Sequence, residues 1–225
     1  MSGWPRTLLL FTASCLIFTT AAMVVRDRME RTAAKEAQIE AALQAATATP
    51  ELRIRYDEGD YPSFDLPGGG QETVRSVLNI TRPMRYGGYV WDETGIPEGP
   101  ILIRIDLGRQ LLSIFRGGHE IGSAVILYGT DGKATPTGSF PILQKAADYH
   151  SRTYDAPMPY ALRLTDDWVA IHGSDVRTGF ATHGCIGVPV AFARRLFEQA
   201  REGDRVVILP AGAQRALSDG SADPA

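Results

Sequence analysis

One cysteine and two histidines have the residue types and spacing that thiol chemistry requires. Cys185 lies in the segment Thr182-His183-Gly184-Cys185-Ile186, and His172 lies upstream in Ile171-His172-Gly173. A free thiol is only slightly ionised at neutral pH, and a neighbouring imidazole can lower its pKa and accept its proton. The chain's other cysteine, Cys15, lies in a long uncharged stretch, so the folded part carries one unpaired thiol. The pattern predicts Cys185 as a nucleophile and His172 as its base.

The neighbours of this pair supply the supporting groups that acyl transfer needs. The Gly173 carbonyl is the nearest group that can orient the His172 ring, the third role in a catalytic triad. The backbone N–H groups of His183, Gly184 and Cys185 can receive the oxyanion of a tetrahedral intermediate. The predicted reaction is therefore acyl transfer through a thioester.

Short turn-bounded strands dominate residues 100–209. Residues 101–107 and 110–116 are separated by a turn and predict a β-hairpin. Pro189 and Gly203 mark the start and stop of one helix. Further strand candidates are residues 123–128, 139–144, 160–165, 168–172 and 205–209. We expect a mainly β fold, a sandwich or open barrel with one or two short helices.

The first 25 residues contain a stretch that can cross a membrane. Residues 7–25 carry no charge and are long enough to span the roughly 30 Å of a bilayer's hydrocarbon core as a helix. We predict a membrane anchor at residues 1–25. A cleaved signal segment is the alternative, although a typical signal core is shorter than this stretch. Either segment would export the domain that follows it.

The segments that flank the β-rich region are polar or rich in turn residues. Residues 26–46 consist mostly of helix formers and predict a solvated helical stalk. No apolar heptad series is sustained there, so we expect a monomer, with a self-associating coiled coil as the alternative. Residues 47–98 contain several prolines and a triple glycine, which favour a linker or loosely attached arm, with a short helix and then a segment packed on the domain within residues 72–91. The tail, 211–225, is predicted to be disordered, which leaves 99–210 as the catalytic domain.

Composition limits the partners that the chain can bind. The 225 residues have a formal net charge of −3 and a sequence pI near 5.8, without a run of Lys or Arg. Nucleic-acid binding requires a basic patch or stripe, so we expect no nucleic-acid partner. A hydrophobic content of 44% gives room for one core of ordinary size.

The thiol segment resembles the signature of a known enzyme family. His172-Gly173-Ser174 followed by Thr182-His183-Gly184-Cys185-Ile186 resembles the motif of the L,D-transpeptidases, the YkuD-type catalytic domain of bacterial cell-wall enzymes. The segment Thr135-Pro136-Thr137-Gly138-Ser139-Phe140 is similar to the Thr-Pro-x-Gly-x-Phe segment of that domain, and the hairpin at 101–116 to its opening hairpin. The resemblance covers residues 100–209.

The resemblance implies a mechanism, a substrate and a location. Cys185 would attack the carbonyl of the third residue of a peptidoglycan tetrapeptide stem and release D-alanine, and an amine would then resolve the thioester. His172 would move the proton, Gly173 would hold His172, and Thr182 would occupy the Ser/Thr position of the motif. The acceptor would be another stem, a protein lysine, a free amino acid or water. No cofactor or metal is implied. The domain would lie in the periplasm, anchored to the inner membrane or secreted if the N-terminal segment is cleaved.

Two features depart from the family pattern. Gly187 stands where the family usually has Arg or Asn, and the interval from His172 to Thr182 is several residues shorter than usual. With Gly187, the polar support of that side chain is missing or comes from elsewhere, and the short interval affects the shape of the substrate pocket and the choice of acceptor. Tyr160 and His150 are the remaining candidates for residues that bind substrate; the alternatives are a core position for Tyr160 and an ordinary loop position for His150.

Five other interpretations accompany this prediction. Asp166-Asp167 is best interpreted as a hairpin turn, and Thr135 as part of a tight turn packed near the cysteine. A hydrolytic carboxypeptidase or endopeptidase would use the same site with water as acceptor. A zinc hydrolase would use His172, His183 and Cys185 as ligands, although no acidic general base accompanies them. A catalytically silent module would bind peptidoglycan stems in the same groove.

Overall fold

A computed structural model describes residues 52–129 and 132–211, together with six helical, exposed positions: Arg26, Arg28, Glu30, Arg31, Ala34 and Lys35. Residues 51–225 group as one compact unit, separate from residues 1–50. The predicted membrane segment at 1–25, most of the predicted stalk at 26–46 and nearly all of the predicted tail at 211–225 lie outside the described residues. Among the described residues, we find no helix with the length and apolar character needed to span a membrane.

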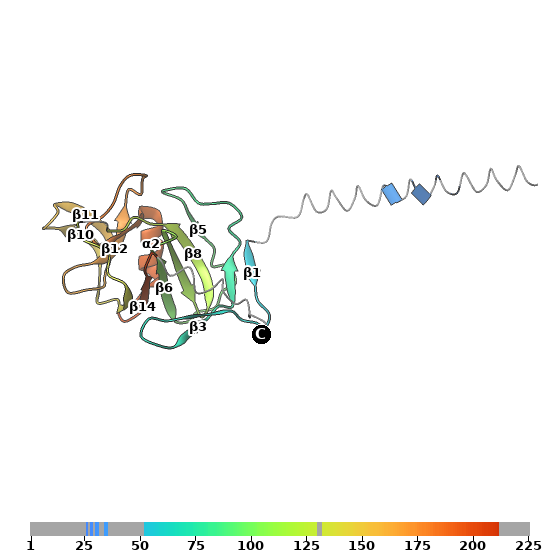
Figure 1. Ribbon diagram of the computed structural model, residues 1–225, viewed down its shortest axis with the longest axis horizontal. Coiled ribbons are helices and arrows are strands. Elements are labelled where there is room, and N and C mark those ends of the chain that lie inside the picture. The colour runs from blue at the N-terminus through green and yellow to red at the C-terminus, as the bar shows by residue number, and fades with distance from the viewer. Residues whose placement is uncertain are drawn as a thin grey trace, which may run out of the picture. The chain divides into compact units, whose positions relative to one another are not determined.

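The larger of two main sheets has eight strands and forms the centre of the domain (Figure 1). Its strands lie in the order β1 (Arg53–Arg55), β4 (Ser76–Leu78), β8 (His119–Val125), β7 (Leu111–Arg116), β6 (Ile101–Asp106), β14 (Arg205–Leu209) and β9 (Gly138–Pro141), and β5 (Tyr89–Trp91) also pairs with β8. The hairpin predicted at 101–116 is confirmed as β6 and β7, which pair antiparallel. The predicted terminal strand is confirmed as β14, which pairs parallel with β6.

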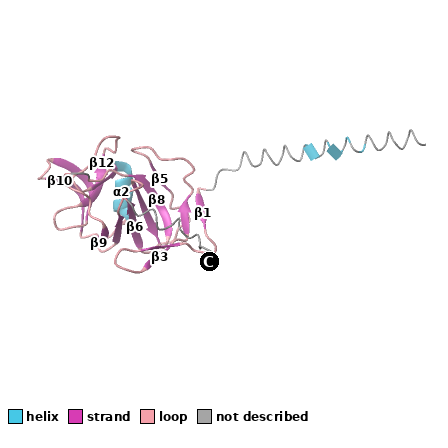
Figure 2. Cartoon of the chain, in the orientation of Figure 1, coloured by secondary structure: helices cyan, strands magenta, loops and turns pink. Residues whose placement is uncertain are grey.

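A second sheet of four strands stands beside the first one and carries the thiol segment (Figure 2). Its order is β10 (Gln144–Ser151), β11 (Ala156–Arg163), β12 (Ala170–Ser174) and β13 (Ile186–Pro189). β11 pairs antiparallel with both of its neighbours, β10 and β12, whereas β12 and β13 pair parallel. A separate two-stranded hairpin consists of β2 (Ser63–Asp65) and β3 (Gln71–Thr73).

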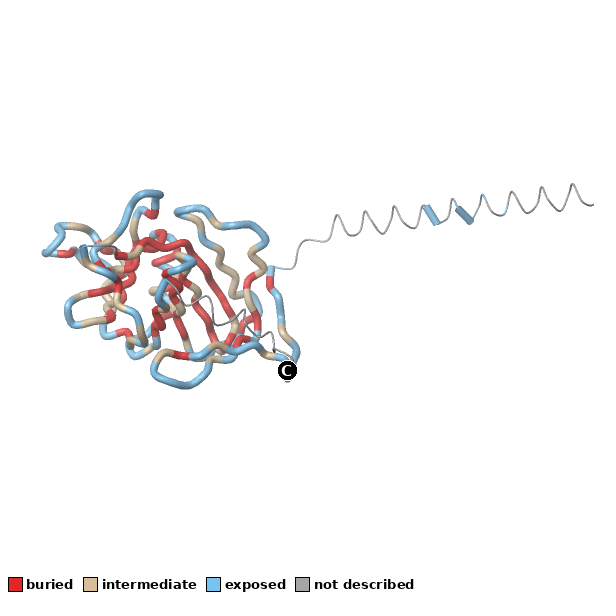
Figure 3. The backbone as a smooth tube through the Cα atoms, in the orientation of Figure 1, coloured by how far each residue is buried: buried red, intermediate tan, exposed pale blue. Residues whose placement is uncertain are grey.

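Helix α2 (Val190–Gln199) joins the two sheets through one apolar face. Phe192, Ala193 and Leu196 are buried at helical spacing. The Phe192 ring contacts the rings of Tyr89 and Trp91 on β5, with centroids 5.8 and 5.4 Å apart, while the helix also contacts β11 and β12. Each large apolar side chain buried here contributes about 1.5–3 kcal/mol. Figure 3 shows the resulting core, with buried backbone along the middle strands and the helix and exposed backbone along the outer loops.

Lys145 of β10 completes the carboxyl end of α2. Its Nζ donates to the carbonyls of Phe197 and Ala200 at 2.6 and 2.5 Å and lies 4.4 Å from the Phe197 ring centroid. The last carbonyls of a helix have no partner within the helix, and a cation stabilises them. The smaller sheet therefore contacts both ends of the helix: β13 leads directly into the amino end of α2, and Lys145 of β10 binds its carboxyl end.

The structure corrects the interpretation of residues 47–98 as a linker or loosely attached arm with a short helix. The described part of this segment contains five strands and no helix, and β1, β4 and β5 belong to the larger sheet. Buried Arg53 fixes the attachment, because its guanidinium donates to Ser76 Oγ at 3.0 Å, the Glu120 carbonyl at 2.6 Å and the Asp92 carbonyl at 2.6 Å. The strands are only three residues long and mostly exposed, so they lack the apolar alternation that identifies a strand in sequence.

The hairpin of β10 and β11 is longer than the sequence predicts. Strand candidates at 139–144 and 160–165 become parts of β9 and β11, while residues 144–151 form a strand that was not predicted. Most residues of β10 are exposed or half-buried on both faces, so polar residues predominate in its sequence. The hairpin projects beside the thiol segment and provides one wall of the site described below.

Candidate active site

The register of two parallel strands brings Cys185 and His172 together. Ile171 pairs with Ile186 and His172 with Gly187, so Cys185, one residue before β13, lies opposite Ala170. Side chains two residues apart on a strand share a face, and so do side chains opposite each other on paired strands. Cys185 and His172 therefore lie diagonally on one face of the smaller sheet.

Two cavities meet at the Cys185 thiol. A small one of about 140 Å³ is lined by His172 and Cys185, together with Ser151, Tyr154, Ala156, Met158, Thr182 and His183. A larger one of about 530 Å³ opens to solvent and contains Cys185 but not His172. The hairpin of β10 and β11 contributes to both cavities. A peptide lying in the larger cavity can thus present a carbonyl to the thiol while its leaving group faces the histidine.

The His172 ring is buried and held in one tautomer. Its Nδ1 lies 2.9 Å from the Gly173 carbonyl oxygen, which only accepts hydrogen bonds, so Nδ1 carries the proton. Nε2 is then the free base. Burial lowers the pKa of His172 below its ordinary value, and the hydrogen bond to Gly173 opposes this effect. The imidazole is neutral at pH 7 and ready to accept a proton.

The Cys185 thiol is in its neutral form at rest. Burial raises the pKa of Cys185, although a backbone hydrogen bond at Ala170 and the charge of Lys133 oppose this. The expectation that a neighbouring imidazole would lower this pKa is wrong for the free protein. The reason is that the imidazole is itself neutral, and the charge of Lys133 offsets only part of the desolvation of the sulfur. The resting site therefore holds a proton on the sulfur and a free basic nitrogen, Nε2, on His172.

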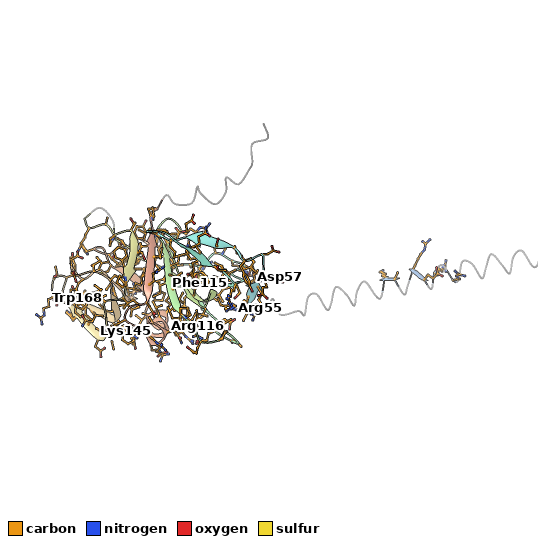
Figure 4. All side chains as sticks on the ribbon, turned by 90° about the horizontal axis from the view of Figure 1, so that it is seen from below. Arg55, Asp57, Phe115, Arg116, Lys145 and Trp168 are labelled. Atoms are coloured by element: carbon orange, nitrogen blue, oxygen red, sulfur yellow. The ribbon has the colours of Figure 1, made fainter. Side chains whose placement is uncertain are left out.

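The turn between β11 and β12 supplies a backbone carbonyl that accepts a hydrogen bond from the thiol. Cys185 Sγ donates to the Trp168 carbonyl oxygen at 3.5 Å. Trp168 has a φ of 64°, a conformation that is costly for a bulky residue. Its ring stacks on Tyr149 with centroids 3.8 Å apart and planes 5° apart, which holds the strained turn. Figure 4 shows Trp168 at the end of the domain opposite to Arg55, so the site lies far from β1.

Thr135 fixes the peptide that precedes the nucleophile. Its buried hydroxyl accepts a hydrogen bond from the Gly129 N–H at 2.8 Å and donates one to the Gly184 carbonyl at 3.0 Å. In a trans peptide the carbonyl and the next N–H point in opposite directions, so the Cys185 N–H is directed away from Thr135. Gly184 adopts a φ of 100°, which requires glycine. These contacts hold the peptide that was predicted to form the oxyanion hole.

We expect Thr135→Val to lower kcat more than it raises KM. Valine keeps the shape of the side chain but leaves the Gly129 N–H and the Gly184 carbonyl without this partner, which costs about 1–3 kcal/mol, or about ten- to a hundredfold in kcat. Thr135→Ser retains the hydroxyl and is expected to keep kcat within about threefold of wild type. Steady-state turnover in the predicted acyl-transfer reaction measures both variants. Equal losses in the two variants would contradict this role.

Gly129 allows the loop after β8 to reach the thiol segment. A Cβ on Gly129 would lie 2.2 Å from the Lys133 carbonyl oxygen and 2.5 Å from the Gly184 nitrogen. Both contacts are with backbone atoms, so the structure has no room for a side chain at position 129. Gly129 also bridges to Thr182, and Leu127 exchanges two hydrogen bonds with Gly187. The sequence analysis did not identify Gly129, because its role depends only on this approach between distant segments.

The other predicted site residues divide into two groups. His183 and Thr182 lie at the site: the His183 ring stacks on Tyr154 at 4.6 Å between centroids, and Thr182 Oγ1 donates to the Cys185 carbonyl at 2.5 Å. Tyr160 and His150 do not line either cavity. Tyr160 packs on Phe197 of α2, and the exposed His150 ring lies 2.9 Å from Asp155.

Gly187, the departure from the family pattern, faces a serine across the sheet. A Cβ on Gly187 would lie 2.9 Å from Ser174 Cβ and 3.2 Å from its Oγ. Ser174 therefore occupies the space that a larger residue at position 187 would need. An Arg or Asn there would have to displace it.

The zinc interpretation finds no matching geometry. In residues 52–129 and 132–211, no three or more His, Cys, Asp or Glu side chains are grouped so that they could hold a metal ion. His172, His183 and Cys185 line one cavity but do not form such a group, since the His183 ring lies against Tyr154.

Residues 100–208 match the family model of YkuD, the L,D-transpeptidase catalytic domain. This segment is a YkuD domain. It contains β6 to β14, α2 and every residue of the two cavities at the thiol. The preceding strands β1 to β5 lie outside the YkuD match, although three of them complete its larger sheet.

Several solved L,D-transpeptidases are similar to about half of this chain. An L,D-transpeptidase from Stackebrandtia nassauensis is 22% identical with a TM-score of 0.47, over 51% of this chain and 57% of that one. One from Mycobacterium tuberculosis H37Rv is 18% identical with a TM-score of 0.46, over 49% and 57%. One from Xylanimonas cellulosilytica DSM 15894 is 25% identical with a TM-score of 0.44, over 52% and 63%. The chain thus spans less than two thirds of each of these proteins. No curated protein matches this sequence.

Proposed function

We propose that this chain is a cell-wall L,D-transpeptidase that forms a thioester between Cys185 and a peptidoglycan tetrapeptide stem. The observation that carries the proposal is that Cys185 and His172 line one cavity within a YkuD domain. The exchangeable proton, the free Nε2 of His172 and the fixed Gly184–Cys185 peptide are the three groups that acyl transfer requires. The protein would act in the cell envelope, where its substrate is found.

The first half of the reaction forms the acyl-enzyme. The thiol proton moves to Nε2 of His172 as the sulfur attacks the carbonyl carbon between the third stem residue and D-alanine. The Cys185 N–H supports the oxyanion. The C–N bond then breaks, and His172 gives its proton to the departing amine, so D-alanine leaves as the neutral amine product. The Gly173 carbonyl stabilises His172 while the ring is protonated.

The second half transfers the acyl group to an acceptor. An amine entering the small cavity loses a proton to Nε2 of His172 and attacks the thioester carbon. The C–S bond breaks and the sulfur takes the proton back. An amine acceptor yields a new peptide bond, whereas water yields a free carboxylic acid and makes the protein a carboxypeptidase.

Mass spectrometry of the full chain mixed with a stem tetrapeptide tests the proposal. We expect a mass increase equal to that of the tetrapeptide minus D-alanine, one D-alanine released per protein in the first turnover, and peptide mapping that places the adduct on Cys185. Addition of a second stem as amine acceptor is expected to yield a cross-linked dimer. Release of D-alanine together with a free tripeptide, without a cross-linked product, would identify the hydrolytic enzyme. Absence of adduct and release, from folded protein with a reactive thiol, would refute catalysis and favour the silent binding module.

A further inference from the structure

Lys133 and Asp167 form an ion pair in the wall of the larger cavity, where no step of acyl transfer uses them. Lys133 Nζ lies 2.8 Å from Asp167 Oδ2. Lys133 comes from the loop between β8 and β9, and Asp167 from the turn between β11 and β12, so the fold brings the pair together from distant segments. Both residues line the cavity that opens at Cys185.

Both side chains are held in place beside the nucleophile. Asp167 Oδ1 accepts a hydrogen bond from Thr165 Oγ1 at 2.6 Å. The aliphatic stem of Lys133 lies 3.4–3.5 Å from the position that a Cβ on Gly184 would occupy, so it covers the residue before Cys185. The charges of Lys133 and Asp167 both act on the pKa of Cys185, in opposite directions. The pair is therefore close enough to the sulfur to contact a bound substrate.

The pair remains charged at neutral pH and keeps binding capacity. The hydrogen bond between them raises the pKa of Lys133 and lowers that of Asp167. Their side chains are 38% and 63% exposed, so the ion pair adds little to stability. An ammonium has three donors and a carboxylate about four acceptor sites. Lys133 can thus bind a further anionic group, and Asp167 a further cationic group, while the ion pair between them is kept.

We propose that Lys133 and Asp167 are a binding site for an α-amino carboxylate group, which carries an ammonium and a carboxylate on one carbon. Lys133 binds the carboxylate and Asp167 binds the ammonium, and the four charges alternate in sign. This inference rests on the proposed function and specifies its substrate. The third residue of the stem carries this group at the end of its side chain when that residue is diaminopimelate, and the site lies beside the carbonyl that Cys185 attacks.

The site predicts discrimination among stems by their third residue. A stem with lysine at this position presents the ammonium alone, and a stem with amidated diaminopimelate presents an ammonium and a neutral amide. Neither can bind Lys133 as a carboxylate does. Lys133→Met tests this contact cleanly, because methionine preserves the apolar stem over Gly184 and removes only the charge. Asp167→Asn removes the partner for the ammonium and keeps an oxygen for Thr165.

Acylation kinetics of the full chain, followed by intact mass, test the inference. The donors are tetrapeptides with diaminopimelate, amidated diaminopimelate or lysine as third residue. For Lys133→Met we expect the half-saturating concentration to rise about two- to fivefold with diaminopimelate, a scale set by exposed charge pairs, and to stay unchanged with the other two donors. For Asp167→Asn we expect a similar rise with all three donors. Arg177→Met serves as the matched control, because Arg177 belongs to an exposed ion pair with Asp175 that lines neither cavity.

The outcomes separate this inference from the function on which it rests. One outcome would overturn the α-amino carboxylate site alone. In it, wild type forms an adduct with all three donors, and Lys133→Met leaves the half-saturating concentration unchanged or shifts it equally for every donor. Absence of an adduct on wild type with every donor would refute the proposed function, and the substrate assignment with it. A rise confined to the diaminopimelate donor supports the site. If Lys133→Met instead changes only the transfer step to a diaminopimelate acceptor, the donor assignment is wrong.

Discussion

Cys185→Ala is expected to abolish both the covalent adduct and the release of D-alanine. Alanine has no nucleophile, and the loss of a nucleophile that acts as a unit with its base typically lowers kcat by about 10⁶. Neither the Trp168 carbonyl nor the Gly184–Cys185 peptide can replace the sulfur, because neither has an electron pair suited to form an acyl intermediate. Intact mass and D-alanine release, measured in the same sample, check this expectation.

Cys15→Ala is the matched control for this variant. Cys15 is the only other cysteine in the chain and is far from the motif in sequence, so this variant is expected to form the adduct at the wild-type rate. Cys185 packs with Met158, Ala161 and Ala170, and truncation there is expected to cost about 1 kcal/mol of unfolding free energy. Thermal unfolding therefore shows whether Cys185→Ala remains folded. Retained D-alanine release by a folded Cys185→Ala variant would refute the thioester route.

His172→Gln is expected to lower kcat/KM by about 10²–10⁴. Glutamine can still donate to the Gly173 carbonyl but has no basic nitrogen, so the thiol proton has no acceptor and the leaving amine has no donor. The substrate contacts of the larger cavity are unchanged, so KM is expected to stay within about threefold. His150→Gln changes the exposed histidine that lines neither cavity and is the matched control. Similar losses in the two variants would contradict the assignment of His172 as base.

The pH dependence of wild type follows from the two pKa shifts. The active form has a protonated thiol and a neutral imidazole. Because burial lowers the pKa of His172, this form persists below pH about 6.5, the ordinary histidine value, and activity declines only as the pH falls further. Because burial raises the pKa of Cys185, the alkaline decline begins above the ordinary thiol value. We expect kcat/KM to show a broad bell-shaped dependence on pH, whose two apparent pKa values belong to the Cys185 and His172 pair as a whole. An acidic midpoint above pH 7 would contradict the buried neutral imidazole.

The sequence identifies the thiol site because its catalytic residue types cluster locally. Cys185, His172, Gly173 and Gly184 lie in two short segments that together supply a nucleophile, a base and flexible backbone, and the structure places all four at one site. The hairpin of β6 and β7 and helix α2 were equally clear, since alternation and helical spacing of apolar residues are local signals. Helix α2 faces the core on one side and solvent on the other, whereas β6 and β7 have no exposed residue.

Residues whose roles depend on distant contacts were not identified from sequence. Asp167 was interpreted as a turn residue, and it does lie in a turn, but its partner Lys133 is more than thirty positions earlier in the chain. Thr135 was assigned to a turn near the cysteine, yet its hydroxyl bridges Gly129 and Gly184. Tyr160 was left open between the pocket wall and the core, and in the structure its ring packs on Phe197 of α2. A local pattern does not indicate which face of a strand meets the site.

The sequence alone predicted a nucleophile and its base and determined the mainly β character of the domain, since each follows from residue types and short-range periodicity. The tertiary structure decided three other features. It joined strands before residue 98 to the larger sheet through buried Arg53, placed Lys133 and Asp167 beside the sulfur, and set the protonation state of the Cys185 and His172 pair. The physical reason is that burial and long-range pairing set both desolvation and the neighbours of each charge, and neither can be inferred from adjacent residues.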